Sequence, residues 1–265
     1  MIREPLFAGS FYDAKPEDLK NHITEMTGEL VKKTKALGII APHAGYIYSG
    51  VVAAQVYSAV EIPKTIIILG PNHTGLGEPI SVFSEGKWKT PLGDVAINES
   101  LATDILKKCK TALKDTTAHA KEHSIEVQLP FLQYHNKNFD FVPIVLGDYS
   151  IEHLKELAVA LAKCIEGKEV LIIASSDLTH YEEAESARAK DALVLDSIEA
   201  LDPDNMYDEI KDNDISMCGW MPVYVLLQAC NILGAKKGKI IKYTNSGDVN
   251  GDYSEVVGYG GAIII

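Results

Sequence analysis

Three of the eight histidines each follow an apolar stretch that predicts a buried strand: His43, His73 and His180. Imidazole is a common ligand of zinc, iron and copper, and near neutral pH it also acts as an acid or base. Open α/β sheets place ligand pockets outside the carboxyl ends of their strands, so loops after different strands can bring distant side chains together. Each histidine could instead hydrogen-bond only within its own loop. The shared position after strands favours one common pocket.

Cys218 precedes an apolar stretch that predicts a helix from Pro222 to Leu233. A cysteine at a helix N-terminus tends to have a lowered pKa, and the resulting thiolate binds metals or attacks electrophiles. The other interpretation is a small buried residue, as most free cysteines are. The sequence leaves both interpretations of Cys218 open. The remaining cysteines lie within helical patterns and are expected to be buried: Cys109, Cys164 and Cys230.

Three further residues are candidates for the same pocket. Asp177, three residues before His180, either orients that imidazole or caps the following helix. His123 and Glu126 lie at the predicted start of a helix, where polar groups can point into a pocket. Ser124 and its neighbours could equally serve only to cap this helix. The other histidines lie in polar stretches and are predicted to be at the surface: His22, His119, His135 and His153.

The candidate residues lie between predicted strands and helices that alternate along the chain. Apolar runs bounded by turn residues predict buried strands at Ala36–Pro42, Thr65–Leu69, Phe139–Leu146, Val170–Ala174, Lys239–Tyr243 and Val256–Ile265. Helical spacing predicts helices at Pro16–Val31, Gly50–Val60, Glu99–Lys108, Ser124–Tyr134, Ile151–Ile165, Glu182–Ala200 and Pro222–Leu233. This alternation is typical of an α/β fold whose largely parallel sheet carries helices on both faces.

One segment, Ile80–Ile97, alternates apolar and polar residues around two glycine-containing turns. It predicts a β-hairpin insertion that forms a flap. No Pro/Ser-rich linker, charge block or internal repeat divides the chain, so residues 1–265 are predicted to form a single domain.

Composition excludes several classes of protein. The formal net charge of -12 argues against binding nucleic acid or an anionic membrane through the overall field, because such surfaces need a basic stripe. Apolar stretches are far shorter than the ~20 residues that span a bilayer. The N-terminus has no charged region followed by an apolar core, so no secretory signal is predicted and a cytoplasmic location is expected.

At these residues the sequence resembles the Memo family, of the AmmeMemoRadiSam system protein B type. The resemblance covers nearly the whole chain and rests on several motifs in the same order. They are Ala8–Tyr12, Pro42–Gly50, Gly70–His73, Glu122–Phe131, Ser175–Tyr181, Cys218–Gly219 and Gly258–Gly261. The family is similar in turn to the class III extradiol (LigB-like) dioxygenases, non-haem iron enzymes that open catechol-type rings. That kinship implies the same fold and a pocket at the carboxyl ends of the strands.

The resemblance also implies roles for individual residues. In those dioxygenases two histidines and a glutamate hold ferrous iron, and another histidine handles protons. By resemblance, His43 and His73 match the histidine ligands, and His180 matches the proton-handling histidine. Asp177 is the second expected catalytic residue, from its position three residues before His180. Cys218 stands where the carboxylate ligand would be. A thiolate is softer than a carboxylate and is itself oxidised by oxygen, and a site of two histidines and one thiolate suits copper, zinc or iron. The expected cofactor is a divalent or redox metal, with iron or copper favoured and zinc as the alternative.

Three functions follow as expectations. The first is a metal-dependent oxidoreductase, similar to a dioxygenase, that acts on a small organic substrate. The second is a non-catalytic protein that binds a metal or a peptide, or senses redox state through Cys218, with a pocket inherited from an enzyme. The third is a zinc-dependent hydrolase with an open coordination position. A buried pocket and oxygen consumption would favour the oxidoreductase. Metal binding without turnover would favour the non-catalytic protein.

Overall fold

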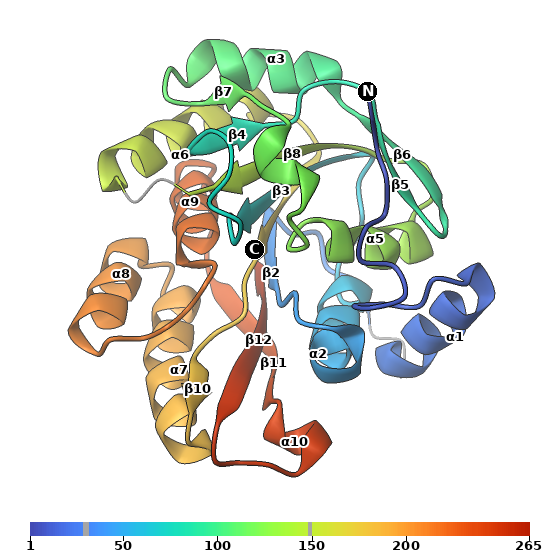
Figure 1. The fold of residues 1–265 in the computed structure, drawn as a ribbon. Coiled ribbons are helices and arrows are strands. Elements are labelled where there is room, and N and C mark those ends of the chain that lie inside the picture. The colour runs from blue at the N-terminus through green and yellow to red at the C-terminus, as the bar shows by residue number, and fades with distance from the viewer. Residues whose placement is uncertain (29–31, 148–149) are drawn as a thin grey trace.

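Parallel strands at the centre of one mixed sheet organise the fold (Figure 1). The computed structural model describes residues 1–28, 32–147 and 150–265. The strands are β1 (Ile2–Arg3), β2 (Gly38–Ala41), β3 (Thr65–Pro71), β4 (Ile80–Val82), β5 (Lys87–Thr90), β6 (Gly93–Ile97), β7 (Leu113–Lys114), β8 (Asp140–Leu146), β9 (Val170–Ser175), β10 (His180–Glu182), β11 (Gly238–Asn245) and β12 (Val256–Ile264). Their order is β1-β5-β6-β8-β3-β9-β2-β12-β10.

The direction of pairing changes from the centre of the sheet to its flanks. Strands β8, β3, β9 and β2 pair in parallel, whereas β12 is antiparallel to β2 and to β11. The predicted α/β class with a largely parallel sheet is confirmed for the central strands. Because β2, β3 and β9 point the same way, their carboxyl ends lie at one edge of the sheet, which is where ligand pockets form in open α/β sheets.

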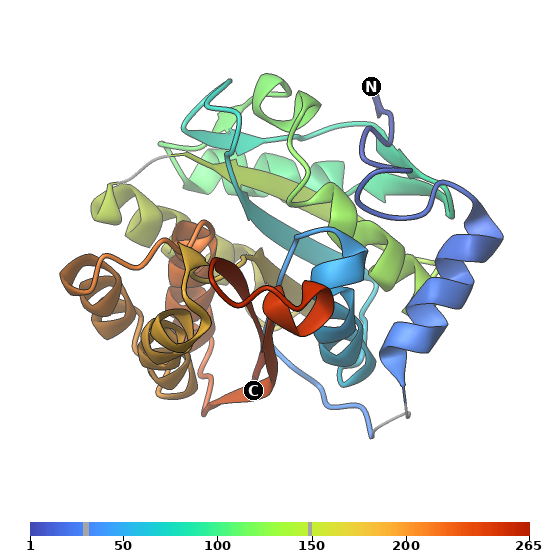
Figure 2. The same cartoon turned by 60° about the horizontal axis from the view of Figure 1, so that its bottom comes forward.

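Helices cover both faces of the sheet, as Figures 1 and 2 show. They are α1 (Pro16–Thr27), α2 (Tyr46–Ser58), α3 (Glu99–Lys108), α4 (Thr117–Ala120), α5 (Leu129–His135), α6 (Ile151–Ile165), α7 (Ala184–Glu199), α8 (Pro203–Asp212), α9 (Trp220–Ile232) and α10 (Gly247–Asn250). Along β3, Ile66 and Ile68 pack with α1, α2 and α5, whereas Ile67 and Leu69 pack with α3, α6 and α9. Successive side chains of a strand point to opposite faces of the sheet. Because both faces are buried here, the side chains on both faces of these strands are apolar, and the sequence shows continuous apolar runs.

Some predicted helices differ from the observed ones. The segment predicted as one helix over Ser124–Tyr134 is a short 3-10 turn (Glu126–Gln128) followed by α5. Pro130 occupies the first turn of α5, where the missing N–H of a proline costs nothing. Helix α8 was not predicted, because only a few of its residues are apolar and buried. The predicted end of the first helix, at residues 29–31, lies outside the described residues.

The predicted flap over Ile80–Ile97 is wrong. Strands β5 and β6 do form an antiparallel hairpin, but β6 continues the sheet by pairing with the start of β8, and β4 pairs with the end of β8. Trp88 of β5 is fully buried under the hairpin. The alternation of apolar and polar residues therefore marks strands at the edge of the sheet that are buried on one face. It does not mark a flap. No helix within the described ranges is long and apolar enough to cross a membrane.

Candidate metal centre

His43 is the most deeply buried of the candidate ligands, with 2% of its surface exposed. It follows β2, whose last residue, Ala41, lies beside Ser175 of β9. Its Nδ1 lies 3.0 Å from the Ser175 hydroxyl, and its backbone N–H donates to Asp177 Oδ1 at 2.7 Å. These contacts fix the ring and direct Nε2 toward Cys218, whose Sγ is 3.3 Å away.

His73, after β3, is held by the buried carboxylate of Glu122. The His73 backbone N–H donates to Oε2 at 2.7 Å, and its ring Nδ1 lies 2.9 Å from Oε1. Oε1 also accepts the Ser124 N–H at 2.9 Å. Burial raises the pKa of Glu122, but these hydrogen bonds and the nearby His73 lower it further, to about 2. Glu122 is therefore ionised, and it holds His73 with Nε2 as the remaining ligand atom.

Cys218 lies one residue before Gly219, the N-cap of α9. A side chain at Gly219 would place a Cβ 2.4 Å from the Ser175 carbonyl oxygen, so only glycine lets this loop approach the end of β9. The Gly219 N–H donates to the Ser176 hydroxyl. Burial, with Asp177 adding to it, raises the pKa of the Cys218 thiol well above its usual range. The sequence left open whether Cys218 is an activated thiol or a small buried residue, and the raised pKa favours a buried thiol that stays protonated when no metal is bound.

The structure brings His43, His73 and Cys218 together, with one ligand atom from each within 4.8 Å of the others. Burial, together with the charge of His73, lowers the pKa of His43 to about 3, so this imidazole is neutral at physiological pH. A neutral imidazole is the form that binds a metal. Two nitrogens and one sulfur match the preferences of copper, zinc and iron. The donor atoms present therefore suit a transition metal.

His123 lies beside both candidate histidine ligands, His43 and His73. Its ring stacks on that of His73, with centroids 4.6 Å apart, and it also contacts Phe7 and Phe11. Burial and the neighbouring histidines lower the pKa of His123 to about 3. His73, Glu122 and His123 form a second set with metal-ligand spacing. Because Glu122 already accepts hydrogen bonds from two backbone N–H groups, we assign it to orienting His73 and not to direct ligation.

His180 is half-buried and lies near enough to His43 for the two rings to interact electrostatically. Its Nδ1 is 2.9 Å from the Ser216 carbonyl oxygen, and its backbone N–H donates to the Ser216 hydroxyl. Asp177 takes neither of its predicted roles. Its Oδ1 accepts the backbone N–H groups of His43 and Ala44 and so shapes the loop after β2. The group that orients His180 is the Ser216 carbonyl.

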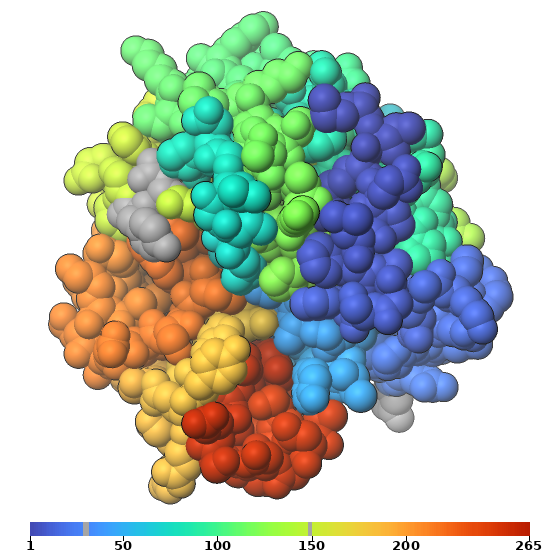
Figure 3. All heavy atoms as spheres, in the orientation of Figure 1, coloured from blue at the N-terminus to red at the C-terminus, as the bar shows by residue number. Residues whose placement is uncertain are grey.

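Glu126 does not line the pocket with His43 and His73. Its carboxylate holds the N-terminal segment: Oε2 pairs with Arg3 at 2.6 Å, and Oε1 accepts the Tyr12 hydroxyl and the Phe7 N–H. Figure 3 shows this N-terminal segment, in dark blue, packed against the green segment that follows α3. The prediction that Glu126 points into the pocket is wrong, because both carboxylate oxygens are taken up by this buried anchor.

His119 is fully buried, contrary to the predicted surface position. Its ring packs against Phe83 and Trp88, and burial lowers its pKa to about 3. Sequence reasoning also missed Glu122, Ser175 and Gln128. Gln128 donates to the Ser175 hydroxyl at 2.8 Å and accepts from the Tyr57 hydroxyl, so it supports the contact to His43. Both Glu122 and Gln128 lie within one motif of the sequence, but their roles depend on contacts across the fold.

Comparison with known proteins agrees with the resemblance in the sequence. The family described as "Memo-like protein" matches residues 3–263. A MEMO1 family protein from Aquifex aeolicus is 44% identical over 266 residues, which cover 100% of this chain and 99% of the relative. Another from Thermotoga neapolitana is 43% identical over 280 residues, with 100% of both chains covered.

A solved structure shares the fold. The crystal structure of an uncharacterized protein from Escherichia coli K12 aligns with a TM-score of 0.58 and 11% sequence identity. The alignment covers 86% of this chain and 100% of that one. At this identity the likeness shows the fold alone. The family match and the full-length relatives show that the chain belongs to the Memo-like protein family.

Proposed function

We propose that this protein binds a transition metal through His43, His73 and Cys218 and oxidises a small organic molecule, with molecular oxygen as the electron acceptor. The observation that supports the proposal is the convergence of three ligand atoms, within 4.8 Å, from loops far apart in sequence. Each histidine is held through Nδ1, which leaves Nε2 for the metal. Such outer contacts commonly orient metal-binding imidazoles.

The charges around the pocket favour a cation. Glu122 is ionised and fully buried beside His73. A bound cation would also stabilise the Cys218 thiolate, which burial otherwise disfavours. An uncomplexed thiol with a raised pKa is a poor nucleophile, so ligation suits Cys218 better than thiol catalysis. We favour iron or copper, since these ions undergo redox chemistry, whereas zinc does not.

The chain's own residues supply the remaining steps. A redox metal would supply electron transfer to or from a bound substrate. With Nδ1 of His180 donating to the Ser216 carbonyl, Nε2 carries the lone pair and can accept a proton from a substrate hydroxyl. The rings of Phe7 and Phe11 pack against His123 beside the candidate ligands and would limit the access of water from that side. His73, with a third of its side chain exposed, marks the solvent-facing side where a substrate would enter.

Metal content tests the proposal. Protein purified without oxygen should bind close to one iron or copper ion per chain after reconstitution, as measured by elemental analysis. Most of the bound metal should be lost in each of three variants: His43→Ala, His73→Ala and Cys218→Ser. His153→Ala, on the exposed start of α6, and Cys164→Ala, in the core, serve as controls that should retain the metal. Wild-type protein that binds no metal after reconstitution would refute the proposal.

A zinc-dependent hydrolase is the second candidate, because the same donors with a solvent-facing side leave a coordination position for water. The discriminating result is zinc retained through purification, with turnover that does not depend on oxygen. Metal bound without turnover on any substrate tested would instead favour a binding or redox-sensing protein. The dependence of turnover on oxygen separates the oxidoreductase from both alternatives.

A further inference from the structure

A chain of hydrogen bonds leads from the interior of the fold to the ring of His43. It begins at Tyr57 of α2 and passes through Gln128, the last residue of the 3-10 turn, to Ser175, the last residue of β9. The Tyr57 hydroxyl donates to Gln128 Oε1 at 2.8 Å, and Gln128 Nε2 donates to the Ser175 hydroxyl at 2.8 Å. All three side chains are fully buried, so bulk water does not compete for these hydrogen bonds.

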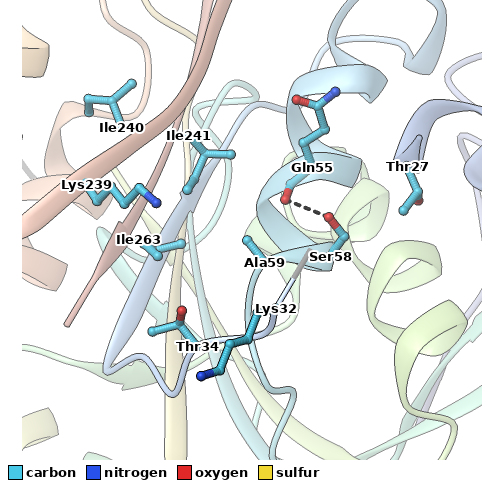
Figure 4. Close-up of a pocket in the computed structure, with 10 residues that line it drawn as sticks. All are labelled: Thr27, Lys32, Thr34, Gln55, Ser58, Ala59, Lys239, Ile240, Ile241 and Ile263. Carbon is cyan, nitrogen blue, oxygen red and sulfur yellow. Dashed lines mark hydrogen bonds between the residues drawn. The ribbon is translucent and has the colours of Figure 1, made fainter. Parts of the chain in front are cut away.

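Packing fixes the Tyr57 end of this chain. The Tyr57 ring stacks on Phe131 of α5, with ring centroids 5.4 Å apart and an angle of 8° between the ring planes. Other residues near the end of α2 face β11 instead and line a groove there: Gln55, Ser58 and Ala59 (Figure 4). In that groove the Ser58 hydroxyl donates to the Gln55 carbonyl oxygen. The Tyr57 hydroxyl is directed to the interior, where the amide of the 3-10 turn accepts its hydrogen bond.

The surroundings of Gln128 determine which way its amide points. Nε2 lies 3.0 Å from the Pro42 carbonyl oxygen, and a carbonyl oxygen only accepts hydrogen bonds. An amide turned by half a rotation would bring Oε1 against this carbonyl oxygen, with no hydrogen between the two atoms. Nε2 therefore faces Pro42 and Ser175, and Gln128 acts as a donor to both.

The Ser175 hydroxyl has one proton to donate, and its neighbours determine where that proton points. Oγ lies 2.6 Å from the Ser124 carbonyl oxygen, which only accepts, so the hydroxyl donates there. Gln128 Nε2 only donates, so it occupies one lone pair of Oγ. His43 Nδ1, 3.0 Å away, must then donate its N–H to the other lone pair. A neutral imidazole has a single N–H, so Nε2 of His43 carries a lone pair.

The two histidines of the candidate metal centre are oriented by different kinds of group. His73 Nδ1 faces the carboxylate of Glu122, which only accepts, so no further residue is needed to place a proton on this nitrogen. A hydroxyl both donates and accepts, so Ser175 alone does not determine which nitrogen of His43 carries the proton. Gln128 makes the difference, because it occupies a lone pair of the hydroxyl and keeps the hydroxyl proton turned away from His43.

We propose that Gln128 is a positioning residue: through the Ser175 hydroxyl it fixes the proton of His43 on Nδ1 and leaves Nε2 ready to bind the metal. Nε2 is the nitrogen that faces Cys218, with Sγ 3.3 Å away. Without Gln128 the Ser175 hydroxyl is free to donate to Nδ1, which moves the ring proton to Nε2 and blocks this ligand atom. The consequence for metal binding rests on the proposed function, whereas the position of the proton is a property of the metal-free protein.

NMR of the full-length, metal-free protein labelled with nitrogen-15 tests the proposal. Correlations from the ring C–H protons distinguish the protonated ring nitrogen from the one that carries a lone pair, and loss of signals in His43→Ala identifies those of His43. Wild-type protein should show the His43 proton on Nδ1 alone. Gln128→Met keeps the length of the side chain without its amide, and it should show the His43 proton shared between Nδ1 and Nε2.

Matched variants separate positioning from a purely structural role. Gln133→Met removes another buried amide, whose hydrogen-bond partners lie in the β5–β6 hairpin, and it should leave the His43 proton on Nδ1. Gln128→Met/Tyr57→Phe also removes the hydroxyl that Gln128→Met leaves unpaired. This double variant should recover part of the lost free energy of unfolding, because a buried unpaired hydroxyl is costly, but it should not recover the wild-type position of the His43 proton.

Metal affinity gives a second measurement, by competition with a chelator. Gln128→Met should bind the metal about tenfold more weakly than wild type, as is typical when an outer contact to a ligating histidine is lost. A wild-type His43 protonated on Nε2, or a Gln128→Met variant with the wild-type proton position, would overturn the proposal. Equal metal affinity in Gln128→Met and wild type would overturn it too. If wild type binds no metal, the proposed function fails, and the NMR result alone decides the role of Gln128.

Discussion

Metal binding should release one proton, and that proton should come from Cys218. Burial raises the pKa of the Cys218 thiol well above its usual range, so the metal-free thiol is protonated near neutral pH. Burial lowers the pKa of His43 to about 3, so its imidazole is already neutral and releases no proton when Nε2 binds a metal. A metal that binds the thiolate must displace the thiol proton. A raised thiol pKa therefore means that affinity increases as pH rises.

The expected magnitude follows from the proton count. One proton released per metal bound raises the apparent affinity about tenfold per pH unit. Between about pH 7.5 and 8.5, imidazoles with an ordinary pKa of about 6.5 are mostly neutral and contribute little to this slope. Cobalt(II) is a suitable probe, because its charge-transfer absorption reports thiolate ligation. Competition with a chromophoric chelator gives the affinity at each pH.

Variants make the result decisive. Cys218→Ser should lose the thiolate absorption and most of the pH dependence, whereas Cys164→Ala, a substitution of a core cysteine on α6, should keep both. A wild-type affinity that does not change over this pH range would show that the thiol is already ionised. A slope near a hundredfold per pH unit would show that a second group also loses a proton. Either result would refute the reasoning from burial.

Three further predictions concern the residues that support the site. Glu122→Gln should lower metal affinity by about 10–100-fold, measured by the same competition, since it weakens the contact that orients His73; an unchanged affinity would contradict that role. Gly219→Ala should lower the free energy of unfolding, measured by urea denaturation, by about 1–3 kcal/mol, because its Cβ would clash with Ser175. An unchanged free energy of unfolding would refute the clash. Glu126→Ala should lower the free energy of unfolding by about 3–5 kcal/mol, because Arg3 would remain buried without a counter-ion. An unchanged free energy of unfolding would show that Arg3 is solvated by water instead.

The family and the main elements were predictable from the sequence for physical reasons. Fully buried strands such as β3 and β9 must be apolar on both sides, so their runs of isoleucine and leucine are visible without the structure. The topology rule for open sheets then predicted that the loops after β2 and β3 meet. Residues 80–97 were misjudged, because alternation marks a half-buried strand without saying which strand it pairs with.

The sequence by itself determined the α/β class, the Memo-like family and the prediction that His43, His73 and Cys218 lie near one another. Tertiary structure alone decided what surrounds them. Glu122 and Glu126 lie four residues apart in one motif, yet one carboxylate faces His73 and the other faces Arg3. The direction of a side chain depends on partners more than 40 residues away in sequence. Burial, which sets the thiol pKa of Cys218, likewise arises only when those distant segments pack together.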